Sequence, residues 1–427
     1  MSGYWDDRDP KRENFRLFMS GEGWKNFADK LADDKKTVEE PGSGNLIQSA
    51  LLNALNSTHL LFLTGAGTSI CARNEAELKQ DAPGMSDLWT AVETKVGQTQ
   101  FKSICDQFSG ANIDKNIEKL LSLCKIQLEL LELAKDDDPK KKPILDFVKN
   151  AEAAILKRVD FVDDKTTIDA HSLIVRKIGR RGIRKPRTKL YTTNYDLCFE
   201  EAARRQRFTI IDGFSHSLDQ VYDRSHFDQD IVRRENAKDA PDYIANVFHL
   251  YKLHGSLDWR RVDGEILRSR GDNGSPVLIY PRSSKYQEAF EAPYLDMMGA
   301  FQAALREPDS ALIVCGFGFN DDHISRPILA AMEANMSLRL IVCDPAFIQD
   351  EESLAASEHV IPDVPDEKNT FLLRLRKLAE SGDPRIHLIN GRFSDLAVAL
   401  PDLIGESDRE RHIARTKLLR EPVEAVK

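Results

Sequence analysis

Five short polar segments, each placed directly after an apolar run, hold the residue types that could do chemistry. They are GAGTS at 65–69, TTNYD at 192–196, HGS at 254–256, GFGFND at 316–321 and DP at 344–345. In open α/β sheets, ligands bind in the crevice at the carboxyl ends of the strands. If the apolar runs are parallel strands, these segments meet at one edge of one sheet and predict a ligand site there.

The first segment has the composition of a phosphate-binding turn. Its glycines would let backbone N–H groups approach a pyrophosphate, and the helix that follows would add a favourable dipole. A tight strand-to-helix turn without a ligand is the alternative. The dinucleotide fingerprint is incomplete, because Ile70 stands in place of the third glycine and no second strand ends in an acidic residue at the usual spacing. An ordinary dehydrogenase is therefore not expected.

The other segments are weak signals when taken singly. Asn194 and Asp196 could be cap or turn residues, and a lone histidine such as His254 is more often structural than catalytic. The run Asp321-Asp322-His323 could suggest a metal site, but adjacent side chains diverge in direction, which favours a helix cap.

The pattern around these segments predicts a Rossmann-like α/β fold, a parallel sheet with helices on both faces. Short apolar runs bounded by turn residues are typical of buried parallel strands, and helical patterns alternate with them. We expect strands at 59–64, 189–193, 247–253, 277–280, 311–315, 338–343 and 386–389, and helices at 45–55, 292–305, 322–334 and 370–381.

The chain divides into three parts by composition. Residues 1–45 are charged and contain several Gly and Pro residues, which indicates an N-terminal extension joined by a linker, with a short helix at 24–31. We expect residues 46–404 to form the main α/β domain, with an all-helical insertion at about 85–185. We expect residues 405–427 to form a charged C-terminal arm. The basic run at 176–189 is interpreted as a solvated helix end, the alternative being a phosphate or partner surface.

Composition excludes several classes of protein. The 427 residues are 41% hydrophobic, and 60 basic against 69 acidic residues give a net charge of −9, so direct nucleic-acid binding is not expected. No apolar run approaches the ~20 residues of a membrane span, so we expect a soluble, cytoplasmic protein. The six cysteines include no CxxC pair, so we expect no metal ligands and no zinc.

The order GAGxS, TxNxD, LHG and then a strand ending in GFG resembles the sirtuin family over roughly residues 46–400. The resemblance implies a NAD⁺ site. It implies catalytic roles for Asn194 and His254, with His254 as the base beside the nicotinamide ribose. It also implies cofactor-binding roles for Gly65, Ala66, Gly67, Ser69, Asp196, Gly316, Gly318 and Asp344.

The chain departs from sirtuin deacylases in one main respect. Deacylases carry a four-cysteine zinc module after the LHG segment, and here no cysteine lies between Cys198 and Cys315. Thr193 and Tyr195 also replace the residues usual on either side of the Asn. These features are similar to bacterial sirtuin-like effectors of antiviral defence, which hydrolyse NAD⁺.

The resemblance therefore implies a NAD⁺ glycohydrolase that releases nicotinamide and ADP-ribose and depletes NAD⁺ in anti-phage abortive infection. An amide such as Asn194 could orient the water, and His254 could accept its proton. A NAD⁺- or ADP-ribose-binding regulatory subunit without turnover and a NAD-dependent protein deacylase are the alternatives. We expect a homo-oligomer, and the family analogy implies a partner encoded nearby, either a HerA-type ATPase or an Argonaute-type protein.

Overall fold

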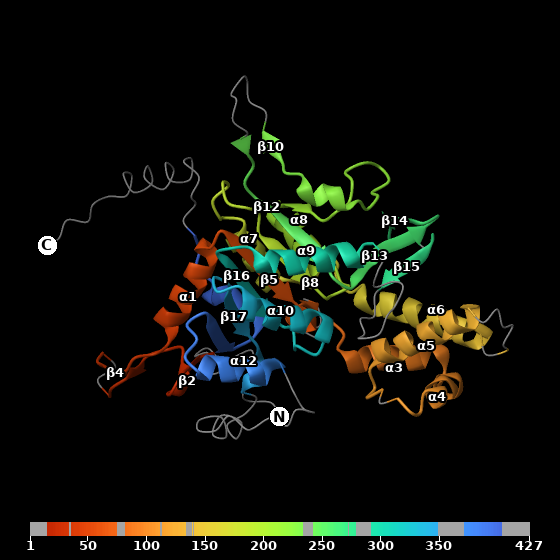
Figure 1. Ribbon diagram of the computed structural model, residues 1–427, viewed down its shortest axis with the longest axis horizontal. Helices are drawn as coiled ribbons and strands as arrows, with labels where there is room; N and C mark the ends of the chain where they lie inside the picture. Colours follow the sequence, from red (N-terminus) through yellow and green to blue (C-terminus); the bar gives the residue numbers. More distant parts are fainter. Residues whose placement is uncertain are drawn as a thin grey trace.

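The centre of the molecule is a nine-stranded sheet in which seven consecutive strands are parallel (Figure 1). The computed structural model describes residues 15–33, 36–74, 82–111, 113–133, 139, 141–233, 242–271, 273–278, 292–348 and 371–403. In spatial order the strands are β2 (Gly23–Asn26), β1 (Arg16–Met19), β18 (Ile386–Asn390), β17 (Arg339–Cys343), β16 (Ser310–Cys315), β5 (His59–Thr64), β8 (Lys189–Thr192), β12 (Val247–Lys252) and β9 (Thr209–Ile211).

Helices cover both faces of this sheet, as the sequence predicted. Successive residues of a strand point to opposite faces. In β5, Leu61 and Leu63 pack into the core under one set of helices, while Leu60 and Phe62 pack into the core on the other face. The first set is α9 (Tyr294–Arg306), α10 (Asp322–Ala334) and α12 (Phe371–Glu380), and the second is α1 (Gly44–Asn56), α7 (Asp169–Ile178), α8 (Cys198–Gln206) and α13 (Phe393–Ala399).

The predicted helical insertion forms a body of its own at one side of the sheet (Figure 1, orange and yellow). It consists of α3 (Met85–Val96), α4 (Gln98–Gln107), α5 (Ile117–Leu133) and α6 (Lys141–Val159), which bury a separate core. Tyr195 and Leu257 from the sheet domain belong to this core, so the insertion is packed against that domain. α7 lies within the span predicted for the insertion but packs on the sheet.

The N-terminal segment differs from the prediction. Residues assigned to an extension form β1 and β2, which add two antiparallel strands to the edge of the sheet beside β18. The helix predicted at 24–31 is wrong, because Trp24 lies in β2 and packs edge-on against Phe18 of β1 at 5.2 Å between ring centroids. Pairing with a sheet edge outweighs the local pattern there. Residues 1–14 and the predicted arm at 405–427 lie outside the described residues.

A second, antiparallel sheet follows the HGS segment. It consists of β13 (Gly255–Val262), β14 (Glu265–Arg268) and β15 (Ser275–Leu278). Val277 was expected in the parallel sheet, but it pairs here instead, because β15 lies antiparallel to β13. The remaining elements are short: α2 (Ala66–Ser69), β3 (Lys30–Leu31), β4 (Val38–Glu40), β6 (Arg73–Asn74), β7 (Thr166–Thr167), η1 (Arg224–Asp228), β10 (Val232–Arg233), β11 (Asp242–Tyr243) and η3 (Pro345–Phe347). No described helix is long and apolar enough to cross a membrane.

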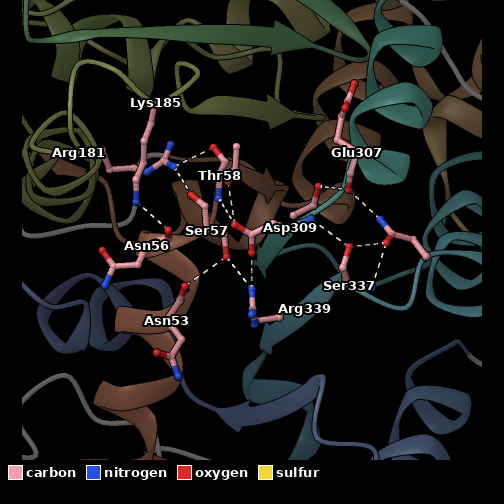
Figure 2. Close-up of polar contacts among 12 residues, drawn as sticks. Asn53, Asn56, Ser57, Thr58, Arg181, Lys185, Glu307, Asp309, Ser337 and Arg339 are labelled. Carbon is pink, nitrogen blue, oxygen red and sulfur yellow. Dashed lines mark hydrogen bonds and ion pairs between the residues drawn. The ribbon is translucent and has the colours of Figure 1, made fainter.

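Two residues of the basic run at 176–189, Arg181 and Lys185, bind the end of a helix (Figure 2). The Arg181 guanidinium, only 7% exposed, donates to the backbone oxygens of Leu55 and Thr58 at 3.0 and 3.2 Å, and Lys185 donates to Asn56 O at 2.7 Å. The carbonyls of Leu55 and Asn56 end α1, where a helix lacks internal partners and carries partial negative charge, and Thr58 lies two residues beyond it. For Arg181, which is buried, the interpretation as a solvated helix end and the alternative of a phosphate or partner surface are both wrong. Lys185 is an exposed donor at a helix end.

Candidate functional site

The predicted polar segments meet at the carboxyl edge, the edge of the sheet where β5, β8, β12, β16 and β17 end. The register places Thr64 beside Thr192 and beside Cys315, so the turns that follow these residues are neighbours. They surround a cavity of about 440 Å³, within the usual range for ligand pockets. The predicted residues that line it are Gly65, Ala66, Ser69, Asn194, Asp196, His254, Gly316 and Gly318.

Two predicted residues do not line this cavity. Gly67 packs against the turn after β16: its N–H donates to Gly316 O at 2.9 Å, and a Cβ on Gly67 would lie 2.7 Å from Gly316 Cα. Gly316 has φ +64, and a Cβ there would lie 2.4 Å from Thr68 N. The two glycines therefore allow two backbone turns to touch. Asp344 caps η3 by accepting from Ala346 N at 2.7 Å.

Asn194 is held in one orientation by the first turn. Its Nδ2 donates to Ser69 Oγ at 2.8 Å and to Gly65 O at 3.0 Å. Ser69 Oγ in turn donates to Asp196 Oδ2 at 2.7 Å, and Asp196 Oδ1 accepts from Cys198 N at the start of α8. Because the amide nitrogen is engaged by the protein, Asn194 Oδ1 is left to accept from a ligand or a water. Asp196 therefore fixes the orientation of the Ser69 hydroxyl group.

A buried lysine supports the loop that carries Asn194. Lys252, the last residue of β12, is 3% exposed, and its Nζ donates to the backbone oxygens of Tyr195 and Asp196 and to Glu200 Oε1. The sequence analysis missed this residue, since a lysine ending an apolar strand carries no motif. Its role is to fix the backbone between Asn194 and α8.

His254 is almost completely buried, with 2% of its surface exposed. The preceding residue anchors it, because Leu253 N donates to Thr192 O at 2.8 Å. Its Nε2 lies 3.3 Å from Nε2 of His323, in the first turn of α10. Burial, and then the neighbouring His323, lower the pKa of His254 well below its usual value. The imidazole is therefore neutral near pH 7, the form that can accept a proton.

The insertion supplies a carboxyl group that the sequence analysis did not anticipate. Glu118 of α5 lines the cavity, and its Oε1 accepts from Tyr195 Oη at 2.9 Å. Burial, and then the charge of Asp321, raise the pKa of Glu118 to about 7. Burial, and then Asp322, raise that of Asp321 to about 6. Asp321 stands at the N-cap of α10, as the sequence predicted, but it makes no side-chain cap hydrogen bond.

Metal ligands are not grouped in the described part of the chain. No set of three or more His, Cys, Asp or Glu side chains that could hold an ion occurs among these residues. The cysteines are free, and Cys198, Cys315 and Cys343 are buried. They are small apolar core residues.

One family model agrees with the resemblance noted from the sequence. Residues 188–362 match the family model described as SIR2-like domain. A solved structure reported as "Structural Basis for the Mechanism and Regulation of Sir2 Enzymes" aligns at 12% identity and a TM-score of 0.35, over 88% of this chain and 99% of that chain. No curated protein matches. Asn194, Asp196, His254, Gly316 and Gly318 all lie within the segment of this chain that is similar to SIR2-like domains.

Proposed function

We propose that the protein is a NAD⁺ glycohydrolase. The observation that carries the proposal is the pairing, in one cavity, of an oriented amide at Asn194 with a neutral, buried imidazole at His254. The SIR2-like segment that holds both residues supports NAD⁺ as the substrate. Four carboxyl groups line the cavity, and two of them, Glu118 and Asp321, face each other there and suit a substrate whose nicotinamide ring carries a positive charge.

The reaction needs little from the protein beyond position and charge. The bond between ribose C1′ and the nicotinamide nitrogen breaks, and its electron pair leaves with neutral nicotinamide. Water oxygen then bonds to C1′. Asn194 Oδ1 holds the attacking water or the ribose hydroxyl beside it, and His254 accepts the proton that the water loses. The products are nicotinamide, ADP-ribose and one proton.

The biological role we propose is depletion of NAD⁺ in an infected bacterial cell, as an effector of abortive infection. An unregulated NADase would poison its host, so we propose a homo-oligomer in the cytoplasm that is held inactive. A partner encoded nearby, a HerA-type ATPase or an Argonaute-type protein, would release it. This part of the proposal rests on the family resemblance, including the GFGFNDDHI run at 316–324.

The test is a nicotinamide-release assay on the purified full chain with NAD⁺ alone, over a range of protein concentrations. Release without any peptide supports the proposal, provided that the Asn194→Ala variant releases none at matched concentration. Release only with an acylated peptide would indicate a deacylase. Tight NAD⁺ binding without release, also in the presence of the neighbouring gene product, would indicate a regulatory subunit. Light scattering should give a multiple of 48.3 kDa.

A further inference from the structure

His323 is the polar side chain in contact with the proposed base, and the function proposed above gives it no role. The two Nε2 atoms are 3.3 Å apart, the ring centroids are 5.5 Å apart and the ring planes are inclined by 34°. A neutral imidazole has one donor and one acceptor nitrogen, so two of them at this distance share a single hydrogen. Hydrogen bonds of this kind are often long in a free enzyme and shorten when substrate binds.

The direction of the hydrogen bond follows from what His254 must do. With Nε2 turned to His323, Nδ1 is the nitrogen of His254 that remains for a ligand, and it must carry a lone pair to accept a proton. The single hydrogen of neutral His254 then lies on Nε2 and is donated to His323 Nε2. His323 must therefore keep its own hydrogen on Nδ1.

The surroundings of His323 are consistent with that tautomer. Burial lowers the pKa of His323 to about 4, so the ring is neutral, while the adjacent Asp322 acts in the opposite direction. Asp322 also accepts from Arg326 of the same helix at 2.8 Å. The other groups facing this region are Tyr294 of α9, whose ring lies 6.1 Å from His323, and Asp321, which faces Glu118 of α5.

We propose that His323 is a positioning residue for His254: its Nε2 accepts the His254 Nε2 hydrogen and fixes the base with its Nδ1 lone pair free for the site. When His254 takes a proton from the attacking water, the imidazolium keeps donating to His323, which spreads the new charge. This inference rests on the proposed function for its kinetic consequence, but its structural consequence can be measured without turnover.

Two substitutions of similar size separate the hydrogen bond from packing. His323→Leu fills the space without an acceptor, whereas His323→Gln offers Oε1 as an acceptor for the same hydrogen. We expect kcat to fall about 10- to 100-fold in the leucine variant, less than for loss of a base, with KM changed little. The glutamine variant should recover most of kcat. Arg326→Ala, on the exposed side of the same turn, is the control and should retain wild-type rates.

The second measurement is the ¹⁵N NMR spectrum of the His254 ring in the full-length wild-type and variant proteins. The wild type and the glutamine variant should show the hydrogen on Nε2, and the leucine variant should show a mixture of tautomers. An unchanged tautomer in His323→Leu, or equal kcat for the leucine and wild-type proteins, would overturn the inference. If the wild type releases no nicotinamide yet the tautomer changes as described, the positioning role is supported and the proposed function fails.

Discussion

The two edges of the parallel sheet use the same residue types in opposite ways. At the amino edge, where the strands begin, Asp309 Oδ2 accepts from Thr58 N and Oγ1 at 2.8 Å each, and Oδ1 accepts from Arg339 at 3.0 Å (Figure 2). At the carboxyl edge, no hydrogen bond or ion pair among the described residues links Glu118 or Asp321 to a cation. One edge is internally paired, and the other is arranged around a cavity.

The pKa values of Asp309 at the amino edge and Asp321 at the carboxyl edge are shifted in opposite directions. Burial alone would raise the pKa of Asp309, but hydrogen bonds from Arg339 and Thr58 lower it below its usual value. Burial also acts on Asp321, where Asp322 adds to it, and the pKa rises to about 6. Groups displaced toward their neutral form and facing a cleft are characteristic of functional sites. We therefore expect substitutions at the carboxyl edge to affect activity, and substitutions at the amino edge to affect stability.

The largest expected effect is the loss of the base. His254→Ala should lower the rate of nicotinamide release about 10²- to 10⁴-fold, or roughly 3–5 kcal/mol of barrier, because the water no longer has a proton acceptor. NAD⁺ binding, measured by calorimetry, should persist. A folded His254→Ala protein that hydrolyses NAD⁺ at the wild-type rate would contradict the assignment of the active site.

The matching change at the amino edge is Arg181→Ala. It should lower the free energy of unfolding by about 2–4 kcal/mol, because the carbonyls that end α1 lose a buried donor. The rate per folded molecule should stay within twofold. Lys185→Ala removes an exposed donor from the same helix end and should cost well under 1 kcal/mol by urea unfolding. Equal costs for the two variants would show that burial of Arg181 does not matter.

Gly67 tests whether every residue at the carboxyl edge affects activity alone, because it belongs to that edge but does not line the cavity. From the sequence, Gly67 was expected to let backbone N–H groups approach a pyrophosphate. In the structure even Gly67→Ala would bring a Cβ to 2.7 Å from Gly316 Cα. We expect a stability loss of about 1–3 kcal/mol from overpacking, measured by thermal unfolding, together with weaker NAD⁺ binding. Gly318→Ala meets the Asn320 side-chain amide at 3.0 Å, which can move, and should cost less.

The smallest expected effect concerns Glu118. Its pKa of about 7 means that the carboxyl ionises as the pH rises through neutrality. Because the ionised form attracts the positively charged nicotinamide ring, the wild-type KM for NAD⁺ should fall as the pH rises from 6 to 8. Glu118→Gln should have a KM that varies less over this range, because only Asp321 is left to ionise there, and that is about fivefold higher at pH 8, ~1 kcal/mol. A wild-type KM independent of pH would argue against contact between Glu118 and the substrate.

Local patterns in the sequence were sufficient for the scaffold and for most of the cavity. The run from His59 to Thr64 has four consecutive apolar residues, Leu60 to Leu63, and stops at a glycine, which predicts a short strand buried on both sides. Asn194 and His254 could be placed at the cavity because each follows such a strand, and parallel strands end at one edge, while their proposed roles came from the family resemblance. A glycine or an amide directly after a strand is a local signal that needs no knowledge of distant contacts.

Tertiary structure alone decided which distant residues meet these groups. Glu118 reaches Tyr195 from the insertion, and His323 reaches His254 from the start of another helix. Gly67 is held to a glycine by the packing of two turns, and β1 joins the sheet beside β18, from the far end of the described chain. Each contact depends on strand order and helix placement, which arise from the burial of the whole core, so periodicity and short motifs carry no trace of them.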